Sequence, residues 1–163
     1  MKNIRIQQLN HENFRIYGDY ANLINPEAVS IGNPPVEFFR DVIPLHLAQN
    51  NVASFSICRV EKRTNLISSA EYHSYCQEGI MPLDGDVLIH VAHATPDEIP
   101  VDAFQVFRIP KGTMVTLKAG VWHHAPFAID CDYVNVLIIL PERTYSNDCI
   151  VKNISSEEQL LIV

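Results

Sequence analysis

Apolar and polar residues alternate through much of this chain, which is the pattern of a β-strand that buries one face. The alternation is strongest in residues 4–7, 54–58 and 104–109. Further stretches with strand character are Leu66 to His73, Asp86 to His93, Met114 to Leu117 and Tyr133 to Leu140. Turn-forming pairs such as Asp84-Gly85 and Ala119-Gly120 separate these stretches. Short strands at such even spacing predict an all-β barrel or sandwich.

Helical spacing is confined to residues His11 to Tyr17, near the start of the chain. Phe14 and Tyr17 fall on one side of this stretch, Asn10 precedes it as a capping residue, and Gly18 follows it as a stop signal. We therefore expect one short N-terminal helix. The next segment, Asn25 to Pro35, is rich in Pro and Gly and is expected to be a loop.

No internal repeat, low-complexity tract or Gly/Ser linker divides the sequence, so residues 1–163 are expected to form a single domain. A chain of this length buries about two-thirds of its unfolded surface, so a metal in it would serve function rather than folding. The net charge of −7 and the pI near 5.4 argue against a nucleic-acid partner. A small anionic substrate would therefore need a local cationic group.

The four cysteines lie far apart without a Cys-x-x-Cys pair, which argues against a disulfide framework and a zinc ribbon. Reduced thiols in a cytoplasmic protein fit this pattern. The first residues contain no apolar segment of a secretory signal. The longest apolar run, Val136 to Leu140, is far shorter than the ~20 residues of a membrane helix. We expect a cytoplasmic protein with no membrane partner.

Four side chains form a candidate metal site. Glu71 and His73 are two residues apart and share one face of a strand, while Glu78 and His123 would approach from neighbouring strands. Two carboxylates and two imidazoles suit a divalent nickel, manganese, iron or zinc ion and leave positions open for a substrate oxygen. The alternative is a pocket in which the same residues bind a substrate by hydrogen bonds without a metal.

The Glu-x-His motif at 71–73, followed by Glu78, Gly85 and a Gly-x-x-His motif at 120–123, resembles the two-motif metal signature of the cupin superfamily. Glu71 takes the place of the usual first histidine. The resemblance implies a cupin-like double-stranded β-helix, a jelly-roll barrel, with these residues at its mouth.

A more specific resemblance extends over nearly the whole chain. Blocks of sequence occur in the order found in the ureidoglycolate lyases, formerly called ureidoglycolate hydrolases: Phe14-Arg-Ile-Tyr17-Gly18-Asp19, Val36-Glu37 with Asp41, Glu71-Tyr-His73, Pro82-Leu-Asp-Gly85-Asp-Val, Gly120-Val-Trp-His123-His124 and Ser146-Asn147-Asp148-Cys149. The resemblance implies a homodimeric cupin-like barrel that converts ureidoglycolate into glyoxylate and urea in allantoin and purine catabolism. This chain departs from those lyases in carrying Glu78 where they carry Gln, and Ala125 before Pro126.

The resemblance also suggests roles for individual residues. Glu71, His73, Glu78 and His123 would hold the metal, and Glu71, His73 and His124 are the candidate catalytic residues. His124 or Glu71 would act as the base or as the proton donor to the leaving nitrogen. Arg59 is the candidate clamp for the substrate carboxylate, because it matches an Arg on the same strand of the lyases and a guanidinium binds a carboxylate through two hydrogen bonds.

Two neighbours of His123 have a second interpretation. Trp122 is a candidate substrate-binding wall of the pocket, yet a large aromatic side chain beside a turn is more often core packing. A regular strand would point His124 away from His123, so both would face the metal only with a bulge.

Other functions remain open at this point. One is a metal cupin of another reaction type, such as an isomerase or oxygenase acting on another small hydroxy acid or sugar. The other is a non-catalytic small-molecule-binding cupin. Residue types alone also leave open whether urea or ammonia is released.

Overall fold

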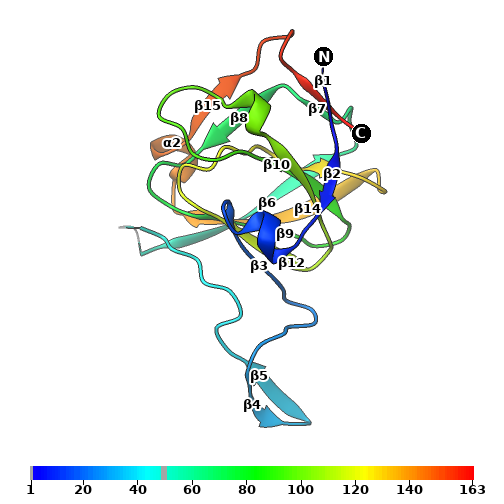
Figure 1. Cartoon of the computed structure of the whole chain (residues 1–163). Coiled ribbons are helices and arrows are strands. Elements are labelled where there is room, and N and C mark those ends of the chain that lie inside the picture. Colours follow the sequence, from blue (N-terminus) through cyan, green and yellow to red (C-terminus); the bar gives the residue numbers. More distant parts are fainter. Residues whose placement is uncertain (1, 49–50) are drawn as a thin grey trace.

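The computed structural model describes residues 2–48 and 51–163, which fold mainly into strands. Two sheets face each other across the main core (Figure 1). The strand order of the first sheet is β3-β12-β9-β14-β6. Its strands are β3 (Gly18–Asn22), β12 (Thr113–Leu117), β9 (Glu78–Pro82), β14 (Tyr133–Pro141) and β6 (Ala53–Glu61).

The second sheet is built around β10. It has the order β13-β10-β11-β2, with β13 (Phe127–Ala128), β10 (Val87–Val91), β11 (Gln105–Ile109) and β2 (Ile6–Gln8). Beyond the end of β10, Ala92 bridges Trp122, and the next residue, His123, bridges Glu71. Glu71 belongs to β8 (Ser69–Tyr72), which pairs with β15 (Ile150–Asn153). The two bridges therefore attach β8 to the same side of the barrel as β10.

The path of the chain between these sheets is that of a jelly roll. Four strands of the first sheet, β6, β14, β9 and β12, face β8, the 121–128 segment, β10 and β11 of the second. In chain order the path runs from β6 to β8, β9, β10, β11, β12, the 121–128 segment and β14. Two facing antiparallel sheets connected in this way define the double-sheet jelly roll that includes the cupins. The prediction of an all-β, cupin-like jelly-roll barrel is confirmed.

A third, smaller sheet covers the outer face of β10. It has the order β1-β16-β7, with β1 (Lys2–Ile4), β16 (Leu160–Ile162) and β7 (Leu66–Ile67). Successive side chains of a strand point to opposite faces. Val87, Ile89 and Val91 of β10 accordingly join the main core, whereas Leu88 and the following Ala92 join a second apolar cluster under the small sheet.

Helices are few and short in the described part of the chain: α1 (His11–Phe14), α2 (Thr144–Asn147) and the 3₁₀ helix η1 (Val101–Ala103). The N-terminal helix was correctly predicted, and Asn10 caps it through a hydrogen bond from the Asn13 backbone N–H. It ends at Phe14 rather than Tyr17, because the Tyr17 N–H bonds to the Phe14 carbonyl in a turn that leads into β3. None of these helices has the length and apolar character needed to cross a membrane.

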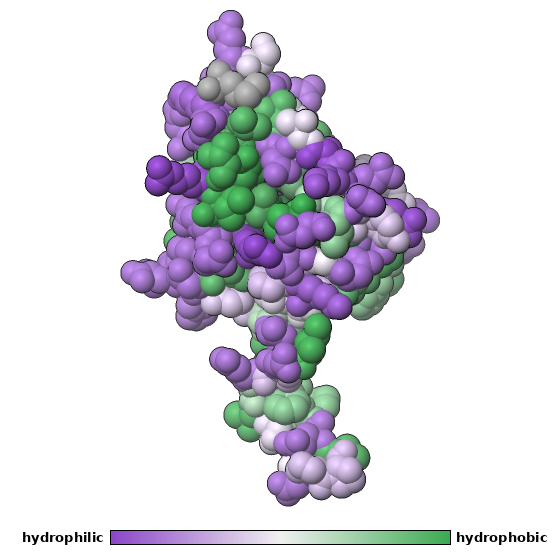
Figure 2. Space-filling model, turned by 90° about the vertical axis from the view of Figure 1, so that its right-hand side faces the viewer, coloured by the Kyte–Doolittle hydropathy of each residue, from purple (hydrophilic) through white to green (hydrophobic). Residues whose placement is uncertain are grey.

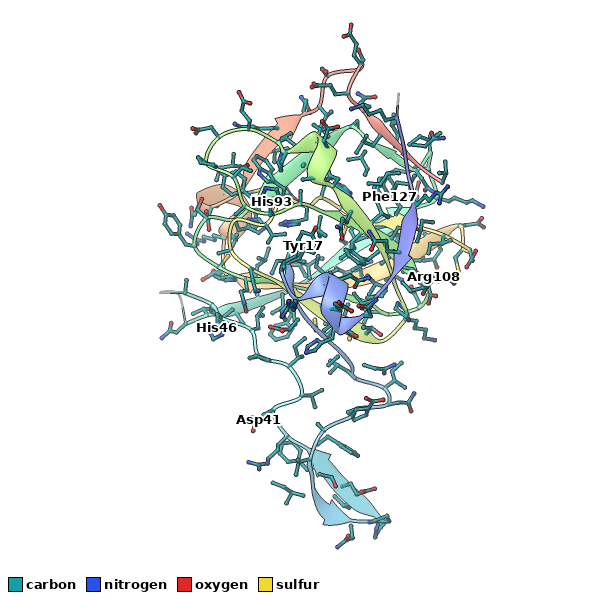
Figure 3. The ribbon with its side chains drawn as sticks, in the orientation of Figure 1. Tyr17, Asp41, His46, His93, Arg108 and Phe127 are labelled. Atoms are coloured by element: carbon teal, nitrogen blue, oxygen red, sulfur yellow. The ribbon has the colours of Figure 1, made fainter. Side chains whose placement is uncertain are left out.

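A β-hairpin projects from the barrel as an arm (Figures 1 and 2). It consists of β4 (Ser30–Asn33) and β5 (Val36–Phe39), so the segment from Asn25 to Pro35, which was expected to be loop, also contains one short strand. Asp41 lies on the segment that leads from the arm back to the barrel (Figure 3). The arm presents apolar side chains to solvent: Val29, Ile31, Val36 and Phe38. Its strands are too short for the alternation of residues to reveal them.

Candidate functional site

His73, Glu78 and His123 converge inside the barrel. One ligand atom from each lies within 4.8 Å of the others. The Nε2 atoms of His73 and His123 are 2.9 and 2.8 Å from the same Glu78 carboxylate oxygen, Oε2. All three side chains are buried. β9 supplies Glu78 from the first sheet, and the two histidines come from the second sheet, so the facing sheets bring the group together.

The backbone fixes how the two imidazoles present their nitrogen atoms. His73 Nδ1 lies 2.6 Å from the Asp148 carbonyl oxygen, and His123 Nδ1 lies 2.8 Å from that of Val121. Because a carbonyl oxygen can only accept, each Nδ1 carries a proton, and the Nε2 atom of each ring is directed toward Glu78. The two Nε2 atoms and the Glu78 carboxylate oxygen are all electron-pair donors. They can lie this close together only if the imidazoles carry protons or a cation lies between the three atoms.

This donor set fits a divalent metal. Imidazoles whose Nδ1 donates to a backbone carbonyl are the usual supported form of a metal-binding histidine. Burial alone would raise the pKa of the Glu78 carboxyl, but the two imidazoles bring its pKa down to about 2. Burial also opposes a charge on His123, yet Glu78 outweighs this effect and raises the pKa of His123. A divalent ion would replace protons that the metal-free group holds.

Glu71 lies beside this group but outside it. The sequence suggested four ligands, whereas the close group of the described residues contains three. The Glu71 side chain instead accepts a hydrogen bond at Oε2 from the Cys149 thiol, 3.2 Å away. Burial raises the pKa of Cys149 to about 12, with Glu71 adding to the shift, so this thiol stays protonated and remains a donor. Glu71 is therefore placed to contact a ligand in the cavity rather than to complete the close group.

A cavity of about 170 Å³ opens next to the group. Glu71, His73, Glu78 and His124 supply its polar wall. Its other lining residues are Cys58, Ile80, Ala125, Pro126, Ile138, Leu140, Tyr145 and Cys149. Polar groups gathered at one end of an otherwise apolar cavity are typical of a site for a small polar molecule.

His124 faces this cavity although a regular strand would turn it away. The segment forms isolated bridges at Trp122 and His123 and then leaves the sheet, so strict alternation does not extend to His124. Burial lowers the pKa of His124, and the positive fields of His123 and Arg63 add to this, while Glu71 acts in the opposite direction. His124 is therefore neutral near pH 7 and able to accept a proton.

Neither of the two residues expected to bind substrate lines the cavity beside the metal group. Trp122 is fully buried in the second apolar cluster, where its indole Nε1–H donates to Thr95 Oγ1 at 2.7 Å and its ring meets Tyr72 edge-on. This position agrees with core packing, the second interpretation given for Trp122, rather than with substrate binding. Arg59 Nε donates to Asn135 Oδ1 at 3.0 Å, and its guanidinium lies over the Tyr133 ring. Asn135 and Tyr133 both belong to β14, so the Arg59 side chain lies over this strand on the outer face of the first sheet.

Asp148 supports the site in a way that sequence reasoning missed. Its side-chain oxygens accept hydrogen bonds from the backbone N–H groups of Ser74 and Tyr75 at 2.7 and 2.9 Å. Its own carbonyl accepts from His73 Nδ1. Asp148 thus ties the segment after α2 to the loop that follows His73. The Ser146-to-Cys149 block marked this region, but nothing in the sequence indicated that it meets His73.

Comparison with known proteins identifies the family of this chain. Residues 1–162 match the family described as Ureidoglycolate lyase. The chain belongs to the ureidoglycolate lyase family. A ureidoglycolate lyase from Salmonella typhimurium is 22% identical over 159 residues, covering 95% of this chain and 96% of that protein. The ureidoglycolate lyase from Salmonella paratyphi B is 21% identical over the same length.

Solved structures similar to this member of the ureidoglycolate lyase family include a dTDP sugar isomerase from Desulfovibrio desulfuricans. It has a TM-score of 0.48 and 10% identity, with 86% of this chain and 87% of that chain covered. Bacillus subtilis oxalate decarboxylase has a TM-score of 0.45 and 13% identity, covering 60% of this chain and 23% of that chain.

Proposed function

We propose that this protein is a carbon–nitrogen lyase that cleaves ureidoglycolate into glyoxylate and urea with a divalent metal held by His73, Glu78 and His123. The observation that carries the proposal is the convergence of these three side chains beside a small cavity in a chain that matches the ureidoglycolate lyase family over residues 1–162. The donor set suits nickel, manganese, iron and zinc alike.

The reaction requires two proton transfers. The substrate hydroxyl loses its proton, its carbon becomes the aldehyde of glyoxylate, the carbon–nitrogen bond breaks, and the urea nitrogen gains a proton. A divalent metal, when bound, supplies Lewis-acid chemistry that lowers the pKa of a coordinated hydroxyl. The side chains around the cavity then have to hold the substrate and move the protons.

His124 and Glu71 are the groups we assign to proton transfer. His124 lines the cavity, and its lowered pKa keeps it neutral, so its ring can accept the hydroxyl proton. Glu71 lines the same cavity and is oriented by the Cys149 thiol. The proton that His124 takes from the hydroxyl has to reach the leaving nitrogen, and Glu71 is positioned in the same cavity to carry it there. His73 contributes by shaping the metal group, not by exchanging protons with the substrate.

Glu78 is consistent with an anionic substrate only if its charge is offset. A bare carboxylate at the centre of the site would repel a 2-hydroxy acid. Two imidazoles already contact Glu78, and a divalent ion would add two positive charges to the group. The departure of this chain from the lyases that carry Gln at this position therefore favours a metal-loaded site.

The test is to incubate purified protein with ureidoglycolate, with and without EDTA, and to measure glyoxylate, urea and ammonia. We expect glyoxylate and urea in equal amounts, faster than spontaneous decay, with activity lost after EDTA and restored by one of the candidate metals. His123→Ala should match the spontaneous rate, and His93→Ala, a change at an exposed histidine, should keep full activity. Glyoxylate formation at the spontaneous rate with every metal would reject the activity, and resistance to EDTA would reject the metal.

We also propose that the protein is a cytoplasmic homodimer in which the arm contacts the second copy. Val36 and Phe38 are 74% and 63% exposed, which is costly for apolar side chains on a projecting hairpin. The four cysteines are free, which is consistent with a reducing compartment.

Light scattering after gel filtration tests the dimer. The mass should be twice the 18.4 kDa of one chain, and Phe38→Ser should shift the protein toward the monomer. Ile16→Ser, at an exposed apolar residue outside the arm, should remain dimeric. A wild-type protein that elutes as a monomer at all concentrations would rule out this assembly.

A further inference from the structure

A second cavity of about 470 Å³ adjoins the one beside the metal group. Cys58, His124 and Ala125 line both, so His124 stands between them. Arg63 lies on the wall of the second cavity, together with Arg59, Glu61 and Lys62. The wall that carries Arg63 therefore begins at residues that also line the cavity beside the metal group.

The Arg63 guanidinium is held in place on one side. Its Nη2 donates to the carbonyl oxygens of Ala125 and Pro126 at 3.1 and 2.8 Å. The guanidinium lies over the Phe127 ring, 4.2 Å from the ring centroid, and Figure 3 shows Phe127 within the barrel wall. An arginine fixed by stacking and by backbone acceptors loses little freedom when it binds a further group.

Arg63 also lacks an acidic partner. Among the described residues, the ion pairs of arginine within 4.0 Å involve Arg108 and Arg143. Arg108 has two carboxylates, those of Asp86 and Asp130, whereas the contacts of Arg63 are neutral carbonyls and an aromatic ring. Arg63 as a whole is exposed, and the partial burial of its guanidinium lowers its pKa. Such a group favours an anion in the adjoining cavity.

Arg59, the clamp expected from the sequence, has a different environment. Its Nε is bonded to Asn135, whose amide in turn donates to Asp84. The Asn135 side chain thus links Arg59 to the carboxylate of Asp84 by two hydrogen bonds. Arg59 lines the second cavity as Arg63 does, but its Nε is already bonded to Asn135 and its guanidinium lies over the Tyr133 ring.

We infer that Arg63 binds the carboxylate of the substrate and so sets the preference of the site for an anionic over a neutral ligand. Nη2 of Arg63 is occupied by the two carbonyl groups, so Nε and Nη1 provide the donors for the carboxylate. The hydroxyl of the same molecule would then lie on the side of His124 and the metal group. The identity of the substrate rests on the proposed function, whereas the assignment of Arg63 as an anion-binding residue does not.

The binding test uses glycolate, a 2-hydroxy acid, and glycolamide, its neutral amide, as matched probes. Ligand-detected NMR titration of purified protein with Zn²⁺ added should show that glycolate binds more tightly than glycolamide. Arg63→Gln should weaken glycolate binding about tenfold or more, the usual effect of losing a charge-assisted hydrogen bond, and should leave glycolamide unchanged. Arg5→Gln, which removes an exposed positive charge between β1 and β2, should bind both probes as the wild type does.

The competing assignment is tested by Arg59→Gln. Loss of glycolate binding in Arg59→Gln together with normal binding in Arg63→Gln would overturn the inference, and so would equal binding of the two probes by the wild type. Thermal unfolding identifies a variant that fails to fold. In that case Arg63→Lys decides: because an ammonium cannot reproduce the fork of two donors, weaker glycolate binding supports the inference and unchanged binding overturns it.

Kinetics separate this inference from the proposed function. If the protein cleaves ureidoglycolate, Arg63→Gln should raise KM about tenfold or more, with a smaller change in kcat. If the wild type does not cleave ureidoglycolate, the proposed function fails, while the glycolate titration still tests Arg63. An Arg63→Gln enzyme with wild-type KM and wild-type glycolate affinity would reject the inference even if the lyase activity is confirmed.

Discussion

His90 and His123 are both almost completely buried, with 1% and 3% of their surfaces exposed, yet their surroundings are opposite in kind. His123 faces the interior of the barrel and meets the Glu78 carboxylate and the Val121 carbonyl. His90 faces the second apolar cluster, between Phe104 and Phe127, with one long contact of 3.3 Å to the Ser69 carbonyl and an unpaired Nδ1.

The comparison shows that burial by itself does not make a histidine functional. Burial lowers the pKa of His90 to about 3, and the nearby histidines add to this effect, so His90 remains neutral. The pKa of His123 is raised because Glu78 outweighs the same burial. A pair of imidazoles directed at one carboxylate can bind a metal. A single imidazole among aromatic rings is a packing residue, and it lowers the free energy of unfolding at low pH.

The largest expected effect is on the His123 side of the comparison. Glu78→Gln keeps the shape of the side chain but removes the charge that both imidazoles contact. Affinity for the divalent metal should fall by at least about a hundredfold, because a metal ligand and its charge are lost together. Metal content after dialysis and titration calorimetry measure this. Glu61→Gln, at an exposed carboxylate on β6, is the matched control. A Glu78→Gln protein that retains full metal content would show that the contact with Glu78 is not what distinguishes His123 from His90.

The second-largest expected effect is the pH dependence of stability that His90 causes. Its pKa is about 3 in the folded protein and 6.5 when unfolded, so between these values the unfolded chain binds the additional proton. Stability from neutral His90 is complete above pH 6.5 and is lost as the pH falls; at pH 5 the loss is about 2 kcal/mol. His90→Leu should therefore lose about 2 kcal/mol less than the wild type between pH 7 and pH 5 in urea unfolding.

The matched control for His90 is His93→Leu, because His93 is exposed. This variant should lose as much stability as the wild type over the same pH range. Equal pH slopes for His90→Leu and the wild type would show that His90 titrates normally and that its burial has no electrostatic cost.

A smaller effect is expected where Asp148 supports His73. Asp148→Ala removes the acceptors for the Ser74 and Tyr75 N–H groups, and the Asp148 carbonyl that holds His73 Nδ1 then becomes less fixed. Metal affinity should fall by about tenfold, as is usual when the support of a ligand is lost. Titration calorimetry measures it, and Asp132→Ala, at an exposed carboxylate, provides the control. Unchanged affinity would mean that His73 needs no support from this segment.

The smallest effect on the metal group should come from Glu71→Gln. Glu71 lines the cavity and accepts from Cys149, but it lies outside the close group of three. Metal affinity should change by less than about threefold, since neither a ligand nor the support of one is lost. A much larger loss in the same calorimetric titration would establish Glu71 as a fourth ligand, as the sequence suggested.

The periodicity of the chain was sufficient for the strands but not for the arm. The alternation of β6 and β11 lies in strands of nine and five residues, which is long enough to distinguish a strand from a loop. The hairpin strands β4 and β5 have four residues each and lack a buried face, so no apolar alternation marks them. Their position away from the barrel came only with the three-dimensional structure.

The sequence by itself determined the all-β class, the short helix after Asn10 and the candidates His73, Glu78 and His123, because strand period and residue chemistry are local properties. Tertiary structure decided which candidates meet. It brought Glu78 of one sheet between two histidines of the other, placed Glu71 beside Cys149, and bonded Arg59 to Asn135 and Arg63 to the carbonyl groups of Ala125 and Pro126. These outcomes depend on how two sheets face each other and where a strand ends, and neither is encoded in the spacing of residues along one strand.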